Sequence, residues 1–129
     1  MHRILRPLPH GIIDYAMVLY LAAGPSVVGF RGKQAMICWA LAVVHLLLTV
    51  LTRFPAGIVK IVRFPLHGAI ELVVGLLLII LPWLANFSKG LLSRNFFVAT
   101  GALILVIWFL TAYRAPRAVP VADRADSRE

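Results

Sequence analysis

The sequence predicts an all-α membrane protein in which four transmembrane helices form two parallel-repeat helical hairpins. Four apolar stretches divide the chain, and a pattern of histidine, acid and proline in its first half returns in its second half. The chain has 129 residues, of which 61 % are apolar and 14 % are charged. It is therefore the size of one domain, and it has too few polar residues to cover a water-soluble fold.

The apolar stretches are the expected membrane spans. They cover Gly11 to Gly24, Gln34 to Thr52, Leu66 to Leu81, and Asn95 to Tyr113. The second and fourth are each long enough to cross a bilayer core of about 30 Å at about 1.5 Å per residue. Pro25 and Pro82 interrupt the first and third, so we expect a proline-marked break there, near the membrane surface.

The basic residues predict an orientation. Nine of the 13 Lys and Arg residues lie in the N-terminal segment, the central loop and the tail, and four lie in the two hairpin turns. The positive-inside rule then places both termini in the cytoplasm, with the spans in an inner or plasma membrane. We interpret residues 1–113 as the transmembrane domain. Residues 114–129 mix charges without an apolar period and are expected to form a disordered cytoplasmic tail.

An internal repeat has an offset of 57 residues, with one copy at about 3–53 and the other at about 60–113. The gap-free alignment pairs His10 with His67, Asp14 with Glu71, Pro25 with Pro82, and Phe30 with Phe87. Two crossings separate equivalent points, so the copies run in the same direction and are related by an axis along the membrane normal. The two histidines should therefore lie at the same depth.

Two segments of this repeat also carry a family resemblance. They are His10-Gly-Ile-Ile-Asp14 followed by Pro25, and His67-Gly-Ala-Ile-Glu71 followed by Pro82-Trp83. These segments resemble the two halves of an SPW-repeat membrane protein, over about residues 7–113. The chain departs from the Ser-Pro-Trp pattern of that family, with Gly-Pro-Ser in the first copy and Leu-Pro-Trp in the second. The resemblance implies the two-hairpin fold and no established activity.

A histidine and an acid four residues apart begin each copy. His10 and Asp14 share one helix face, as do His67 and Glu71, with about 6 Å between them along the axis. Parallel repeats would join them in one layer of two imidazoles and two carboxylates, a ligand set suited to zinc, iron or manganese. His45, which lies mid-span and has no counterpart in the other copy, is a secondary candidate as a third ligand or proton relay.

Three functions are open on the sequence alone. In the first, the chain is a structural or accessory membrane protein: the macrodipole favours Asp14 and Glu71 in the early turns of their helices, and each histidine is bonded to its own acid or to neighbouring backbone. In the second, it binds a divalent metal or, because no CxxCH motif occurs, a non-covalent haem between His10 and His67. In the third, the two acids titrate during proton or ion passage.

The expected partners are the lipid bilayer and either further copies of the chain or a larger membrane complex. Basic residues cluster between apolar runs rather than along one face, so the net charge of +8 does not indicate nucleic acid. No HExxH, GxSxG, P-loop or dinucleotide-binding motif occurs, so we do not expect an enzyme. Cys38 is interpreted as a buried small hydrophobe, and Tyr113 as an interfacial aromatic residue.

Overall fold

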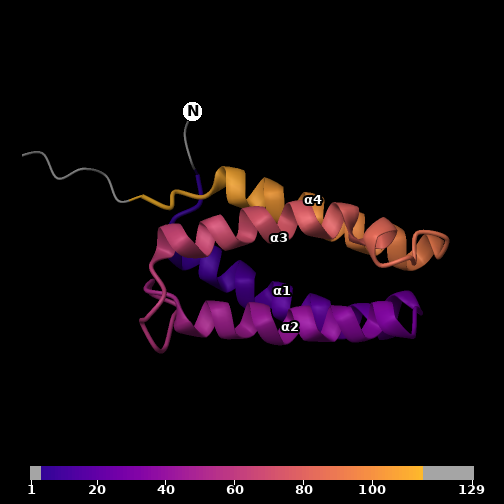
Figure 1. Cartoon of the computed structure of the whole chain (residues 1–129). Helices are drawn as coiled ribbons and strands as arrows, with labels where there is room; N and C mark the ends of the chain where they lie inside the picture. Colours follow the sequence, from indigo (N-terminus) through magenta and orange to yellow (C-terminus); the bar gives the residue numbers. More distant parts are fainter. Residues whose placement is uncertain (1–3, 115–129) are drawn as a thin grey trace, which may run out of the picture.

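The computed structural model describes residues 4–114, which form a bundle of four antiparallel helices (Figure 1). In chain order they are α1 (Pro7–Val28), α2 (Lys33–Leu51), α3 (Phe64–Leu84) and α4 (Leu91–Leu110). All four are long and apolar enough to cross a membrane. Within the described range the only β-type pairing consists of two isolated bridges. The expected tail, from residue 115 onward, lies outside the described residues.

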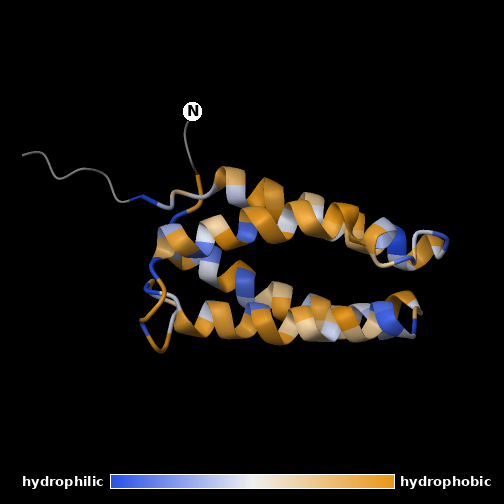
Figure 2. Ribbon diagram, viewed as in Figure 1, coloured by the Kyte–Doolittle hydropathy of each residue, from blue (hydrophilic) through white to orange (hydrophobic). Residues whose placement is uncertain are grey.

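Apolar residues predominate along all four helices, as the hydrophobic colour of the ribbon in Figure 2 shows. Large side chains point outward on every helix, and Leu19, Val27 and Val73 are 71 %, 81 % and 63 % exposed. Monomeric water-soluble proteins rarely expose apolar surface on this scale. The surface therefore suits lipid, and the predicted membrane bundle is confirmed as an all-α fold of four potential spans.

Helices α1 and α3 are longer than the apolar runs that predicted them. Pro7 begins α1 and Pro65 is the second residue of α3, positions where the missing N–H of proline has no intrahelical partner to lose. Pro25 and Pro82 lie inside their helices, which continue three and two residues further. The expected break is therefore not at the prolines but just beyond them. The first helix ends at Gly29, whose φ of 88° suits a residue without a Cβ.

Two hairpins make up the bundle: α1 packs on α2 and α3 packs on α4, while α1 also contacts α4. The residues just before the first helix of each hairpin pair with the residues just after the second helix of the other hairpin. The backbone of Leu5, just before α1, pairs with Thr111 after α4, and Val62, just before α3, pairs with Thr52 after α2. This reciprocal exchange is what two parallel repeats related by an axis along the bundle require.

Small residues allow close packing within and around the hairpins. A Cβ on Gly101 would lie 2.6 Å from the carbonyl oxygen of Gly75, so α3 and α4 are in backbone contact. A Cβ on Gly68 would lie 2.6 Å from the ring of Tyr113, so the chain after α4 lies directly on α3. These glycines therefore act in helix packing.

Two apolar clusters of different size fill the interior. The larger one includes Met17, Leu21, Cys38, Leu78, Phe97 and Ile104, and the smaller one consists of Phe54, Phe64 and Tyr113 near the chain termini. Cys38 is fully buried, which confirms its interpretation as a small hydrophobe. Between the clusters lies a layer of polar side chains.

Candidate metal centre

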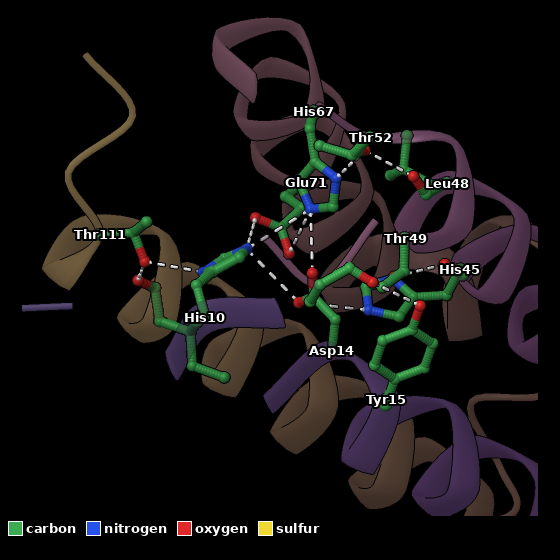
Figure 3. Close-up of polar contacts among 12 residues, drawn as sticks. His10, Asp14, Tyr15, His45, Leu48, Thr49, Thr52, His67, Glu71 and Thr111 are labelled. Carbon is green, nitrogen blue, oxygen red and sulfur yellow. Dashed lines mark hydrogen bonds and ion pairs between the residues drawn. The ribbon is translucent and has the colours of Figure 1, made fainter. Parts of the chain in front are cut away.

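The polar layer contains the four residues that the repeat alignment placed together (Figure 3). His10 and Asp14 come from α1, and His67 and Glu71 come from α3. One nitrogen or oxygen atom from each lies within 4.8 Å of the others. Both histidines are fully buried, and the acids are only 2 % and 4 % exposed. Two hairpins thus contribute equally to one buried group.

The acids do not lie at the helix starts. Asp14 is the eighth residue of α1 and Glu71 the eighth of α3, so each carboxylate lies about two turns, or about 10 Å, into its helix. Neither helix has an acid in its first turn, and the macrodipole effect fades within that turn. The macrodipole explanation is therefore wrong, since both helices begin earlier than their apolar runs suggest. These buried acids need another partner.

Two threonines fix the orientation of the imidazoles. The hydroxyls of Thr52 and Thr111 each donate to the carbonyl four residues earlier in their own segments, at 2.5 and 2.7 Å. Their oxygens are then acceptors for the histidines: the Nδ1–H of His10 donates to Thr111 at 2.9 Å, and that of His67 donates to Thr52 at 2.8 Å. A neutral imidazole carries one N–H, so each Nε2 turns a lone pair toward the layer.

Both Nε2 atoms face both carboxylates at nearly equal distances. His10 Nε2 lies 3.4 Å from Asp14 Oδ1 and 3.3 Å from Glu71 Oε2. His67 Nε2 lies 3.3 Å from Asp14 Oδ2 and 3.5 Å from Glu71 Oε1. The two Nε2 atoms are 3.4 Å apart. Each carboxylate therefore turns one oxygen to each imidazole, and the four groups surround a common centre.

These distances are longer than hydrogen bonds between charged groups. A protonated imidazole bound to a carboxylate has an N···O distance of about 2.7–2.9 Å. By contrast, two atoms that bind one tetrahedral metal at about 2.0–2.1 Å are about 3.3–3.4 Å from each other. The observed nitrogen–oxygen separations of 3.3–3.5 Å lie near that spacing, and one donor atom from each of the four residues lies within 4.8 Å of the others.

Tyr113 supports one of the two acids. Its hydroxyl donates to Glu71 Oε2 at 2.5 Å, and its side chain is 7 % exposed. Tyr113 lies just beyond the end of α4, and its buried hydroxyl faces Glu71 rather than the outer surface of the bundle. Burial, together with the charge of Glu71, raises the pKa of Tyr113, so the phenol keeps the proton that it donates. The corresponding aromatic residue in the first repeat is Phe54, which has no hydroxyl.

His45 lies beside the other acid. Its Nε2 is 3.6 Å from Asp14 Oδ1, which is too long for a hydrogen bond. Among the described residues, the buried side-chain nitrogen and oxygen atoms without a hydrogen bond are His45 Nε2 and Asp14 Oδ2. His45 therefore borders the layer from α2 without belonging to the group of four. Asp14 Oδ2 has no hydrogen bond, whereas Glu71 accepts one from Tyr113.

The arrangement does not fit a haem. A porphyrin held by His10 and His67 would have to lie between their Nε2 atoms, which are 3.4 Å apart. Asp14 and Glu71 each have one oxygen beside either nitrogen, where the porphyrin ring would pass. A single ion meets neither obstacle.

The sequence analysis missed the residues that support the group. Thr52 and Thr111 each follow a leucine directly after a membrane span, at the same point of both repeats. The repeated Leu-Thr pair was the available signal. Nothing in the sequence marked Tyr113, because an aromatic residue at the end of a span is common.

Comparison with known proteins identifies no relative. The chain matches no protein-family model, and it has no significant match among curated proteins or solved structures. The resemblance to SPW-repeat membrane proteins therefore stays a prediction, and the functional argument depends on the site itself.

Proposed function

We propose that this chain is a small integral membrane protein that binds one divalent transition-metal ion between its two hairpins. The ligands are His10, Asp14, His67 and Glu71. The observation that carries the proposal is the spacing of their atoms: two Nε2 lone pairs and two carboxylates face one centre, and the N···O and N···N distances between them are 3.3–3.5 Å. Zinc, ferrous iron and manganese all accept imidazole and carboxylate ligands.

Charge balance supports this proposal. Two ionised carboxylates beside two neutral imidazoles would carry two negative charges in an interior with few water molecules, which is costly. A divalent cation neutralises both. Protonating both imidazoles would also balance the charge, but each Nε2–H would then donate to a carboxylate at about 2.7–2.9 Å, shorter than the observed distances.

A metal at this position would act as a structural tie. Each hairpin supplies one histidine and one acid, so one ion would bind both hairpins at once. Binding free energy released at the centre would therefore stabilise the folded bundle over separated hairpins. This role is consistent with a structural or accessory membrane protein that works beside other copies or a larger partner.

We further infer that the metal lies toward the cytoplasmic side, with both termini in the cytoplasm. Nine Lys and Arg residues lie in the N-terminal segment, central loop and tail, against four in the hairpin turns. His10 and His67 lie near the helix ends that adjoin these nine basic residues. Labelling of the single-cysteine variants Ile4→Cys and Gly32→Cys in intact vesicles tests the orientation. With the cytoplasmic face of the membrane inside the vesicle, only Gly32→Cys should react with a reagent added outside.

Metal analysis of the purified protein tests the function. The full chain is purified in detergent without a polyhistidine tag, with the variants His10→Ala, His67→Ala and His45→Ala. We expect about one metal ion per chain in the wild type and in His45→Ala, and none in the other two. His45→Ala is the matched control because it removes a buried histidine that borders the group without joining it.

A folded wild type that takes up no zinc, ferrous iron or manganese when dialysed against each would contradict the proposal. The polar layer would then be a hydrogen-bonded packing feature. Circular dichroism and gel filtration of all four proteins establish that any loss of metal is not a loss of fold.

A further inference from the structure

A small cavity connects the polar layer with the side of the bundle that faces lipid. It has a volume of about 30 Å³ and lies between residues of α2 and α3, which belong to different hairpins. Its wall is aliphatic apart from His45 and Glu71. Val44 on the wall is 55 % exposed, whereas Glu71 is 4 % exposed. The cavity therefore runs from the outer surface inward to one of the four ligands.

His45 is placed to serve this cavity. Its Nε2 is buried and has no hydrogen bond, whereas nearly all buried polar atoms in proteins have a partner. The same nitrogen lies 3.6 Å from Asp14 Oδ1, so the space beside it adjoins the group of four. A molecule bound there could accept or donate a hydrogen bond at His45 while it contacts the metal.

Aromatic side chains close the other approach to the centre. Phe64 has its ring 5.5 Å from that of His10 and 5.9 Å from that of His67. It also packs against Phe54 and Tyr113, with ring centroids 5.5 and 4.9 Å away. This aromatic cluster covers the histidines on the side of the basic loops.

We propose that the metal binds a small uncharged diatomic molecule, of the class of dioxygen or nitric oxide, which enters from the bilayer between α2 and α3. The inference depends on the proposed metal site. A cavity of about 30 Å³ exceeds the about 10–15 Å³ that one water molecule needs and suits a molecule of two heavy atoms. Its aliphatic wall favours apolar molecules over ions. An ion with these four protein ligands that expands to five- or six-coordination has one or two positions for the guest.

The probe for this inference is nitric oxide added to the full chain loaded with ferrous iron under anaerobic conditions. Formation of an iron–nitrosyl complex is followed by absorbance in a stopped-flow instrument and identified by electron paramagnetic resonance. The test variant is Val44→Trp, which fills the mouth of the cavity. The matched control is Val43→Trp, since Val43 is 58 % exposed on the same helix and does not line the cavity.

We expect a nitrosyl complex in the wild type and in Val43→Trp at the same rate, and a rate at least about tenfold lower in Val44→Trp with the iron content unchanged. Equal rates in all three proteins would overturn the entry route. Stoichiometric iron without any nitrosyl complex, or uptake of zinc but not of iron, would overturn the ligand while leaving the metal site intact. Absence of every metal would instead refute the proposed function, so the two failures are distinguishable.

Discussion

The hydrogen bonds from threonine to histidine lead to a quantitative prediction. Thr52→Val and Thr111→Val keep the shape of each side chain and remove the acceptor of one buried Nδ1–H. A buried donor left without a partner costs about 1–3 kcal/mol, and loss of a hydrogen bond that orients a ligand typically weakens metal binding about 10–100-fold. We therefore expect each single variant to bind its metal about 10–100-fold more weakly than the wild type.

The double variant should show whether the two histidines act independently. If they do, the losses multiply, to about 10²–10⁴-fold. The assay is competition for the metal with a chromophoric chelator at fixed pH. Thermal unfolding of the metal-free proteins gives the separate effect on stability.

The matched control for this prediction is Thr100→Val. Thr100 lies in α4, is as buried as Thr111, and also donates its hydroxyl to the carbonyl four residues earlier, but its other hydrogen bond is with the Tyr20 hydroxyl rather than with a histidine. It should bind metal like the wild type. If Thr52→Val and Thr111→Val bind as tightly as this control, the threonines do not orient the imidazoles and the argument for two inward Nε2 lone pairs is refuted.

Three further predictions follow. Tyr113→Phe should weaken metal binding about tenfold, because Glu71 loses a donor; a difference titration against the wild type should show no tyrosinate from Tyr113 near pH 10, where ordinary tyrosines ionise, because the pKa of Tyr113 is raised. Gly68→Ala should lower the free energy of unfolding by about 1–3 kcal/mol in denaturant titrations, because its Cβ would meet the Tyr113 ring. Asp14→Asn should abolish metal binding yet raise the free energy of unfolding of the metal-free protein by about 1 kcal/mol. The reason is that one buried negative charge is removed and the new amide can donate to the unprotonated Nε2 of His10 or His67. A lower melting temperature without metal would contradict this.

Local patterns in the sequence predicted the spans and the core of the site. Apolar length alone marks the four helices, and a spacing of four residues places His10 beside Asp14 on one helix face. The repeat then adds the long-range step, because parallel copies bring equivalent residues to one level. The same reasoning placed the start of α1 four residues too late and that of α3 two residues too late, because hydropathy does not register the proline-containing start of either helix.

The support around the group could not be predicted in the same way. Thr52 and Thr111 lie 15 and 101 residues from the histidines that they bind. His45 approaches Asp14 from another helix and has no counterpart in the second repeat. Such contacts depend on how the hairpins rotate against each other, and no local period encodes that rotation.

X-ray absorption at the edge of the bound metal tests the central claim most directly. The account predicts a first shell of nitrogen and oxygen atoms at about 2.0–2.2 Å, with the outer-shell scattering of two imidazoles, and the imidazole signal should be halved in a His67→Ala sample that is forced to bind by excess metal. A sulfur shell at about 2.3 Å, or a shell of oxygen atoms without imidazole scattering, would contradict it.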